Sequence, residues 1–424
     1  MGFFKLIPSI YLLDGKSVDK NDHSVPILDG DAVALAKMYS NNGADELIIW
    51  DVSNEENGHE KNIGTMISIT DAIDIPILVA GVINSFDDVK RYLYTGAKKV
   101  ILDASVPSNL EMLGSCAERF GSDKMAMKVD KEYDFKNLKT LKYDGASLIV
   151  ADDCAEKVIG NGIKVMAYGG TNSFEDIVNF AQNEKVYGIS HEDFDTSFKF
   201  VDFKHQLKEQ DIKVYIFESK IPFSKFKLMD NGLIPVVVQD YKTDKVLMVA
   251  YMNEEAYNMT IKTGRMTYYS RSRDEIWIKG LTSGHFQYVK ELKIDCDFDT
   301  ILAKVSQVGV PCHTGADTCF FNELVEGDYN ESNPIKIFEN VYKKIVDRKA
   351  NPREGSYTNY LLDKGVDKML KKFGEEAVET IVAAKNSDSQ ELTYEISDLM
   401  YHLMVIMVEK QITWKDIMKE LSRR

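Results

Sequence analysis

Residues 75–102 read IPILVAGVINSFDDVKRYLYTGAKKVIL, and this stretch decides the fold of the N-terminal part of the chain. The apolar run at Ile75–Ala80 predicts a buried strand, and a second run follows at Lys99–Leu102. Between the two runs, Ser85 and Asp88 have the spacing of a capping box, and a glycine ends the helical pattern. The order strand, helix, strand predicts a parallel β-α-β unit.

The same alternation extends over residues 1–205. Six further apolar runs are found at Phe4–Ile7, Glu46–Trp50, Met125–Val129, Ser147–Ala151, Ile163–Ala167 and Val186–Ile189. Eight strands alternating with helices predict a (β/α)8 barrel. The segment between the sixth and seventh strands is brief and leaves space for only a turn or two of helix. We therefore expect a shortened, degenerate barrel.

The rest of the chain predicts two further domains, so the protein is expected to be multidomain. Residues 203–228 are charged and irregular, and we interpret them as a connector. Residues 229–325 are rich in β-branched and aromatic residues, which predicts a β-rich α+β domain within the bounds 212–330. Residues 335–424 predict an all-α domain, because two apolar rows repeat at helical spacing. The rows are Val366, Leu370, Phe373, Ala377 and Ile381, and Leu392, Ile396, Leu399, Leu403 and Ile406.

The composition narrows the class of protein. A length of 424 residues exceeds one ordinary core, and 44% hydrophobic with 28% charged residues is typical of a globular protein. The formal charge of −15 disfavours nucleic acid or an anionic membrane as a partner. No apolar run suggests a membrane span, and the first residues do not resemble a secretion signal. Five cysteines, an odd number, indicate a reducing compartment, so we expect a cytoplasmic protein.

Three cysteines lie in short polar segments of the central domain, DCDFD at 295–299, VPCHTG at 310–315 and TC at 318–319. Cys296, Cys312 and Cys319 are separated by 16 and 7 positions. Thiolates suit Zn²⁺, and three protein ligands leave a fourth position for a water whose pKa zinc lowers towards ~7. The pattern favours an open catalytic zinc site. A structural zinc site and unliganded thiols are the alternatives.

Three aspartates flank the first of these cysteines. Asp295, Asp297 and Asp299 would share one face of a strand, because side chains alternate with period two. Three carboxylates on one face repel one another unless a hard cation such as Mg²⁺ binds them, and a solvated acidic edge strand is the alternative. Cys296 would then face away, so the two metals of one subunit need not share a pocket. A dimer that combines elements of two chains would resolve this.

A candidate substrate-binding run precedes the aspartates. YYSRSR at 268–273 and WIKGLTSGH at 277–285 gather cations, hydroxyl groups and glycines. Arg271, Arg273 and Lys279 could bind substrate phosphates, since arginine offers a bidentate fork. Each could singly be a surface charge, and their clustering favours binding. The further substrate-binding candidates in this run are Trp277, Ser283 and His285.

Two predicted helices carry acidic groups at helical spacing. Glu375, Glu376 and Glu379 lie on the first helix, and Glu395 and Asp398 lie on the second. If the helices face each other, like-charge repulsion disfavours this concentration of carboxylates without Mg²⁺. The pattern therefore predicts a magnesium site, with an ordinary solvated helix surface as the alternative.

The run GRMTYYSRSRDEIWIKGLTSG, followed by DCDFD, PCHTG and TC, resembles phosphoribosyl-AMP cyclohydrolase over most of the central domain. The resemblance implies that Cys296, Cys312 and Cys319 bind zinc and that the three aspartates bind magnesium. It also implies a homodimer whose zinc site draws on both chains. Zinc hydroxide would attack C6 of the N1-ribosylated adenine and the N1–C6 bond would break, much as zinc deaminases attack purine C6. His313 is our candidate general base or acid.

Residues 356–358 together with GEEAVET (374–380) and YEISDLMYHL (394–403) resemble phosphoribosyl-ATP pyrophosphohydrolase, an all-α family. The resemblance implies that the acids hold Mg²⁺ on the triphosphate, and that Glu376, Glu379 and Asp398 position the attacking water. Lys368 and Lys372 would meet phosphates. The two resemblances together imply a bifunctional hydrolase of histidine biosynthesis. It would convert phosphoribosyl-ATP to phosphoribosyl-AMP and pyrophosphate, and then open the adenine ring to give the aminoimidazole carboxamide product, ProFAR.

Residues 1–200 resemble the cyclase subunit of imidazole glycerol phosphate synthase and its sister isomerase, in IPSIYLLDGK (7–16), NNGADELIIWD (41–51) and AYGGTNSFEDI (167–177). The family's first acid is replaced by Tyr11, and a lysine further on is matched by Asp19. Only Gly81 remains of one phosphate loop, although Gly169-Gly170 persists and Asp130 matches the second acid. Losing a proton-transfer group typically costs ~10²–10⁴-fold in rate. We expect a non-catalytic barrel. Retained activity and a regulatory phosphate site are the alternatives.

Two other functions remain open from the sequence. One is a zinc nucleobase deaminase fused to a nucleotide-pool pyrophosphatase, although the chain lacks the His-x-Glu and Cys-x-x-Cys pattern of deaminases. The other is a non-enzymatic interaction module structured by zinc beside a decayed barrel. Metal-dependent release of pyrophosphate from phosphoribosyl-ATP would separate both from the bifunctional hydrolase.

Overall fold

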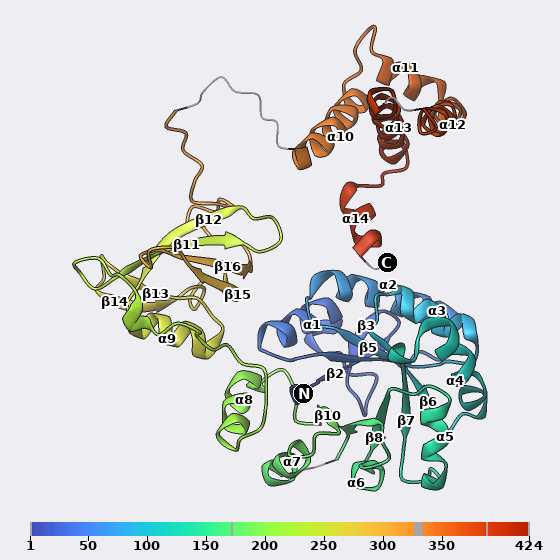
Figure 1. The fold of residues 1–424 in the computed structure, drawn as a ribbon, viewed down its shortest axis with the longest axis vertical. Coiled ribbons are helices and arrows are strands. Elements are labelled where there is room, and N and C mark those ends of the chain that lie inside the picture. The colour runs from blue at the N-terminus through green and yellow to red at the C-terminus, as the bar shows by residue number, and fades with distance from the viewer. Residues whose placement is uncertain (1, 171–172, 326–333, 387–388, 423–424) are drawn as a thin grey trace. The chain divides into compact units, whose positions relative to one another are not determined.

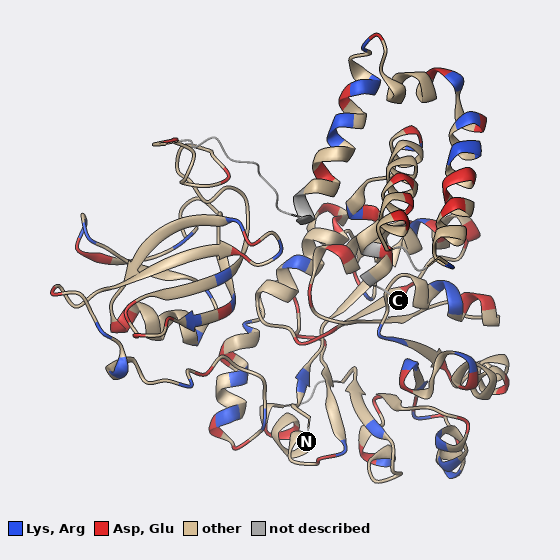
Figure 2. Cartoon of the chain, turned by 45° about the horizontal axis from the view of Figure 1, so that its top comes forward, with Lys and Arg blue, Asp and Glu red and all other residues tan. Residues whose placement is uncertain are grey.

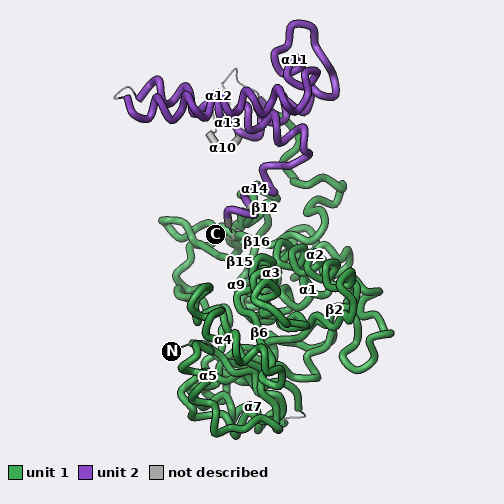
Figure 3. Tube along the Cα trace, turned by 90° about the vertical axis from the view of Figure 1, so that its right-hand side faces the viewer, with its two compact units in different colours: residues 1–323 green, residues 324–424 purple. Residues whose placement is uncertain are grey.

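The computed structural model describes residues 2–170, 173–325, 334–386 and 389–422. The contacts divide the chain into two compact units, residues 1–323 and 324–424 (Figure 3). The predicted boundary between the barrel and the central domain falls inside the first unit. The predicted end of the central domain at residue 330 lies outside the described residues. The three-domain division therefore stays a prediction.

The N-terminal part is a curled parallel sheet with helices along its outer side (Figure 1). Its parallel strands are β1 (Lys5–Leu6), β2 (Ser9–Leu13), β4 (Leu47–Asp51), β5 (Ile77–Ala80), β6 (Lys99–Asp103), β7 (Met125–Val129), β8 (Leu148–Asp152), β9 (Lys164–Tyr168) and β10 (Val186–Ser190). A short strand, β3 (Lys16–Val18), pairs antiparallel with β2.

The predicted strand Phe4–Ile7 is observed as β1, and a further strand that was not predicted, β2, begins directly after Pro8. Pro8 separates the two strands, because proline has no N–H to donate to a sheet. β1 pairs with β10, whereas β2 pairs with β4. The first and last parallel strands of the sheet are thus hydrogen-bonded to each other. Phe4 also bridges Val214 of the connector.

The helices of the N-terminal part are α1 (Ala32–Asn41), α2 (Glu56–Ala72), α3 (Phe86–Tyr94), α4 (Pro107–Phe120), α5 (Leu138–Tyr143), α6 (Ala155–Val158), α7 (Phe174–Ala181) and α8 (Phe200–Glu209). The predicted capping box begins α3, where the Ser85 side chain accepts from Asp88 N and Asp88 accepts from Ser85 N. The short predicted connection is α6, which has four residues. The (β/α)8 prediction is confirmed in part, as a parallel sheet with reduced helices.

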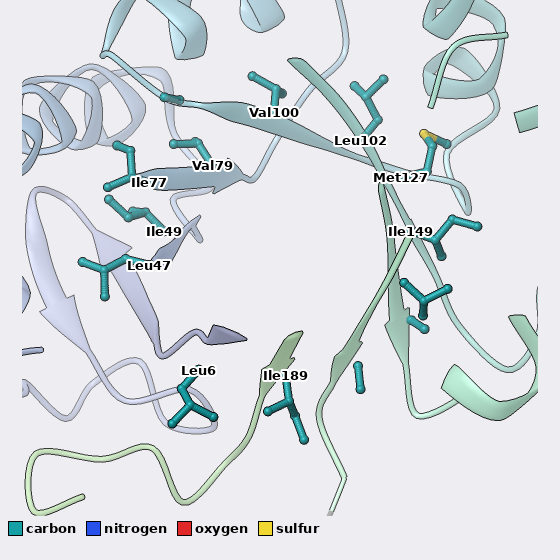
Figure 4. Packing of buried hydrophobic residues seen from close by; sticks show 14 of the residues in the cluster. Leu6, Leu47, Ile49, Ile77, Val79, Val100, Leu102, Met127, Ile149 and Ile189 are labelled. Atoms are coloured by element: carbon teal, nitrogen blue, oxygen red, sulfur yellow. The ribbon is translucent and has the colours of Figure 1, made fainter. Parts of the chain in front are cut away.

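Alternating strand side chains form two apolar layers. Leu47 and Ile49 belong to the layer that also contains helix residues, and Figure 4 shows strand members of this layer around the curved sheet. Ile48, between them, packs instead with Leu78 and Met166 in a second cluster. Because its strands contribute side chains to both layers, the N-terminal part has two distinct hydrophobic cores.

The central part contains a four-stranded sheet, a hairpin and one α-helix among its described residues. The sheet has the order β12 (Val246–Met252), β11 (Ile234–Asp240), β16 (Ile301–Gln307) and β15 (Gln287–Ile294). The hairpin is β13 (Thr267–Ser270) with β14 (Glu275–Ile278), and the helix is α9 (Glu254–Thr263). Asn253 caps the start of α9 and Gly264 ends it with φ 69°. This agrees with a β-rich domain that has little helix.

Several polar contacts join the connector and the central part to the N-terminal part. The first residues of the predicted connector belong to α8, which ends at Glu209. Asp74 accepts a hydrogen bond from Tyr241 Oη at 2.7 Å and pairs with Lys290 Nζ at 2.8 Å. Arg265 donates to Asn42 at 3.0 Å. These contacts explain why residues 1–323 form one compact unit.

The C-terminal unit is all-α in its described residues. Its helices are α10 (Pro334–Ala350), α11 (Tyr357–Lys364), α12 (Val366–Ala383), α13 (Ser389–Glu409) and α14 (Trp414–Ser422). Met369 and Ala383 of α12 are buried, whereas Leu370 and Ile381 of the predicted apolar row are 50% and 61% exposed. These two residues of the row are therefore not part of the core of this unit. No described helix is long and apolar enough to cross a lipid bilayer.

Candidate active sites

The three aspartates of the central part lie in a turn and not on a strand, because β15 ends at Ile294. The Asp295 carboxylate accepts from Asp299 N at 2.9 Å and Thr300 N at 3.1 Å, and Phe298 has φ 69°. The expectation of a shared strand face is therefore wrong. The turn nevertheless brings one carboxylate oxygen each from Asp295, Asp297 and Asp299 within 4.8 Å of one another. This is a group of three exposed oxygen ligands.

Two of the three candidate zinc cysteines lie together. A hydrogen bond from the Thr314 side chain, whose Oγ1 is 3.1 Å from Cys312 Sγ, lowers the pKa of Cys312, and the neighbouring Cys319 lowers it further. Burial raises the pKa of Cys319, and the hydrogen bond with Cys312 raises it further. Cys296 belongs to the aspartate turn. Among the described residues, no three potential ligands that include a cysteine lie within 4.8 Å.

Lys279 lies beside this thiol pair and not on an open surface. Its Nζ donates to Pro311 O at 2.6 Å, and its charge interacts with Cys319 and Cys312. Burial lowers the pKa of Lys279, and the two thiols oppose that shift. The lysine therefore adds positive charge where the thiols meet.

The other candidate substrate groups surround the hairpin and the loop after it. Arg271 lies over the Tyr251 ring at 3.8 Å, and Arg273 pairs with Glu275 at 3.3 Å. Both arginines are exposed, as is His313. The remaining candidates are Trp277, which packs against Tyr268; Ser283, which accepts from His285 N; and His285, whose ring faces Gly309. The fold thus places the two exposed arginines at one end of the hairpin, whereas Trp277 and His285 lie half-buried towards the other end.

In the C-terminal unit, α12 and α13 bring acidic groups of both helices together. Oxygens of Glu376, Glu395 and Asp398 lie within 4.8 Å of one another, and Glu379 adjoins both Glu376 and Glu395. Burial raises the pKa of Glu376, and the neighbouring Glu379 raises it further. Acidic and basic residues both occur along these helices (Figure 2). The arrangement is costly without a cation, since like charges share a partly buried site.

Glu375 and the two candidate lysines occupy the edge of this group. Lys372 Nζ lies 2.9 Å from Glu375 and 3.8 Å from Glu376. Lys368 lies over the Tyr360 ring at 5.9 Å. Glu375 is not among the three clustered ligands, so its predicted role in metal binding has less geometric support than that of Glu376.

The sequence interpretation missed His402. This buried residue lies on α13, with Nε2 3.7 Å from Glu376 Oε1. Burial lowers its pKa, and Lys372 lowers it further. A signal was present, because Glu395, Asp398 and His402 are spaced by three and four positions and share one helix face.

Comparison with known proteins agrees with this division into sites. Models of phosphoribosyl-AMP cyclohydrolase and phosphoribosyl-ATP pyrophosphohydrolase match residues 248–321 and 338–424, and one of a histidine biosynthesis protein matches 5–164. The histidine biosynthesis bifunctional protein HisIE of Thermoanaerobacter pseudethanolicus is 50% identical over 46% of this chain and 97% of its own length. Those of Caldanaerobacter subterraneus and Bacillus subtilis are 50% and 44% identical, over 48% and 47% of this chain and 98% and 95% of their lengths.

The chain belongs to the family of histidine biosynthesis bifunctional proteins. It is accordingly a bifunctional hydrolase of histidine biosynthesis. The two alternatives, a deaminase fusion and a non-enzymatic zinc module, lose their support. The alignments with these family members cover less than half of this chain.

In this bifunctional hydrolase, aromatic side chains gather in the N-terminal sheet around Tyr11. The Tyr11 and Tyr168 hydroxyl groups are 2.5 Å apart, and the Trp50 ring packs against both tyrosine rings. A neighbouring cavity of about 500 Å³ is lined by the acids Asp19, Glu192 and Asp195 among others, with Lys20. Its lining is therefore aromatic and more acidic than basic.

Of the two glycine turns, Gly169 faces carboxylates, whereas Gly81 lies against the Cβ atom of Asp51 and the hydroxyl group of Tyr92. A Cβ atom on Gly81 would lie 2.6 Å from the Asp51 side chain, and one on Gly169 would lie 3.1 Å from carboxylate oxygens of Asp152 and Asp153. Asp130 directly follows β7 but lies outside the cavity lining. Negative charge beside the Gly169 turn disfavours a bound phosphate there.

Proposed function

We propose that the protein hydrolyses phosphoribosyl-ATP at the α12–α13 acidic group and then opens the adenine ring of phosphoribosyl-AMP at the Cys312–Cys319 thiol pair. The observation that carries this proposal is the convergence of Glu376, Glu395 and Asp398 from two helices within 4.8 Å. Burial raises the pKa of Glu376, the neighbouring Glu379 raises it further, and a bound divalent cation would favour the charged carboxylate.

At the acidic group, Glu376, Glu395 and Asp398 would hold Mg²⁺, and Glu379 would accept a proton from the attacking water. Mg²⁺ bound there neutralises charge on the triphosphate. Lys372 now contacts Glu375 and Glu376, and it would turn to the phosphates once a cation takes its place. Lys368 lies on the same helix, and we assign it the same kind of contact.

At the thiol pair, the donor set fits zinc in part. Cys312 and Cys319 supply two soft ligands, and Lys279 favours their thiolate forms. Zinc bound there acidifies a water for attack on purine C6. Arg271 and Arg273 would bind the phosphates, Trp277 and His285 would orient the base, and Ser283 would support His285. His313 would move the proton. The aspartate turn would hold Mg²⁺.

We propose a homodimer as the working form. Cys296 stands apart from the thiol pair within one chain, so a second chain would supply it as the third zinc ligand. The exposed apolar side chains Leu370, Val378, Ile381 and Val382 of α12 support association of the C-terminal unit as well.

We propose further that the N-terminal barrel is non-catalytic. Tyr11, Trp50 and Tyr168 occupy the position of the missing acid, and carboxylates of Asp152 and Asp153 face the Gly169 turn. The full chain should therefore show no cyclase or isomerase turnover. Turnover that depends on Asp130 would contradict this part of the proposal.

The main experiment incubates the full chain with phosphoribosyl-ATP and Mg²⁺, and follows pyrophosphate and the ring-opened product separately. Pyrophosphate should appear first and should depend on Mg²⁺. A zinc chelator should stop ring opening and should spare pyrophosphate release. Loss of both reactions on zinc removal would contradict the two-site proposal.

A further inference from the structure

His402 is a buried side chain whose chemistry the proposed reaction does not use. It lies on α13 one helical turn after Asp398, and only 5% of its surface is exposed. Tyr357 and Tyr401 pack against its ring in edge-on contacts, with centroids 5.9 and 5.4 Å away. A phenylalanine or leucine side chain would provide the same apolar packing. Packing alone therefore does not explain why a histidine, with two polar ring nitrogens, is buried at this position.

The two nitrogens of His402 have different surroundings. Nδ1 is buried and has no hydrogen-bond partner among the described residues. Nε2 faces Glu376 Oε1 at 3.7 Å, the same oxygen that Lys372 approaches at 3.8 Å. A buried nitrogen without a partner is a cost that natural proteins rarely keep without function. The polar interaction that His402 can make is therefore directed at Glu376.

His402 is not placed as a fourth ligand of the acidic group. Its nitrogens do not join Glu376, Glu395 and Asp398 in the group of described atoms within 4.8 Å. A distance of 3.7 Å is also longer than a hydrogen bond, and such contacts commonly shorten when a site becomes occupied. A shift of under 1 Å would make Nε2–H a donor to Oε1.

We propose that His402 is a positioning residue of the pyrophosphohydrolase site. Its Nε2–H donates to Glu376 Oε1 when a divalent cation binds, and this contact fixes the carboxylate plane and leaves Oε2 for the cation. Lys372 is then free to leave Glu376. This inference rests on the proposed function of the acidic group. Removing a side chain that donates a hydrogen bond to a metal ligand typically weakens metal affinity by about 10–100-fold.

The test compares His402→Phe and His402→Gln in the full chain. Phenylalanine keeps the ring contacts and removes the donor, whereas the glutamine Nε2 amide can donate to the same oxygen. Mn²⁺ binding without substrate is measured by electron paramagnetic resonance, and Asp398→Asn identifies which bound Mn²⁺ belongs to this group. We expect His402→Phe to weaken that binding about 10–100-fold and His402→Gln to remain within a few-fold of the wild type.

The rate of pyrophosphate release should be near that of the wild type in His402→Gln and lower in His402→Phe. A high Mg²⁺ concentration should partly restore this rate in His402→Phe. Ring opening of supplied phosphoribosyl-AMP should be unchanged in both. If His402→Phe does not fold, His402→Leu takes its place. Equal Mn²⁺ affinity in the wild type, the Phe or Leu variant and the Gln variant would overturn the inference. Equal losses in the Gln and the Phe or Leu variants would show a purely structural role. If Asp398→Asn binds Mn²⁺ like the wild type, the proposed function itself fails.

Discussion

Replacing Gly309 with alanine should impair ring opening through His285. Gly309 has φ 62°, and a Cβ atom there would lie 2.5 Å from His285 Cδ2 and 2.9 Å from Nε2. The imidazole would have to move by about 1 Å to regain ordinary contact, and a misplacement of that size can cost about 100-fold in rate. We therefore expect ring opening to fall about 10–100-fold.

Gly232→Ala is the matched control in the same part of the chain. Gly232 has φ 75°, and a Cβ atom there meets nothing within 4 Å. An alanine in the left-handed region lowers the free energy of unfolding by about 1–2 kcal/mol in both variants. Only Gly309→Ala adds overpacking, typically about 1–3 kcal/mol. The free energy of unfolding should therefore fall by about 2–5 kcal/mol in Gly309→Ala and by about 1–2 kcal/mol in Gly232→Ala.

The assay supplies phosphoribosyl-AMP and follows the absorbance change as the adenine ring opens. Chemical denaturation of both variants gives the free energies of unfolding, so that a loss of rate can be separated from a loss of folded protein. Pyrophosphate release should be normal in both variants. If folded Gly309→Ala and Gly232→Ala open the ring at the same rate, the idea that Gly309 lets His285 take its working position is refuted.

Four further outcomes are expected. Asp398→Asn should lower pyrophosphate release at least about 100-fold and leave ring opening of supplied phosphoribosyl-AMP intact; a parallel loss of both reactions in folded protein would contradict separate sites. Cys312→Ser should lower zinc content and ring opening, whereas Cys116→Ser, in the N-terminal core, should change neither; normal zinc in the first variant would refute the assignment. The hydrogen bond with Asp51 raises the pKa of His59, so its stabilisation is full below about pH 6.5 and is lost as pH rises through the raised pKa. His59→Gln should therefore cost about 1.5–3 kcal/mol at pH 6 and much less at pH 9 by calorimetry, and an equal cost at both would exclude this linkage. A truncated protein that begins at Ile212 should keep both reactions but unfold at a lower temperature, because it loses the Asp74 contacts; loss of specific activity would give the barrel a part in catalysis.

The repeating units of the N-terminal part were predictable because their signals are local. Ile75–Ala80, Ser85 and Asp88 each specify a strand or a helix start within a few residues, and the structure confirms them. The predicted strand Phe4–Ile7 agrees with β1, but the strand at residues 9–13 was missed, because its place in the sheet depends on pairing with residues 47–51. Apolar pattern alone does not contain such long-range pairing.

The candidate sites were less predictable. The period-two pattern of Asp295, Asp297 and Asp299 suggested a strand. Phe298 instead adopts a left-handed backbone conformation, which cannot be predicted from a phenylalanine side chain. Leu370 and Ile381 have core-like spacing and are nevertheless exposed. Helical periodicity shows that residues share a face, and it does not show whether the covering surface belongs to the same chain.

The pairing of β1 with β10 has a consequence for synthesis on the ribosome. Lys5 and Leu6 are made early, but their partners are Gly188 and Ile189, and Phe4 contacts Val214. At typical translation rates the nascent N-terminus waits about 10–40 s for these residues. During that time β1 has an unpaired edge that another chain could occupy. Ribosome stalling between the codons for Tyr168 and Val214 should therefore favour aggregation of the nascent chain more than stalling after the central part has begun.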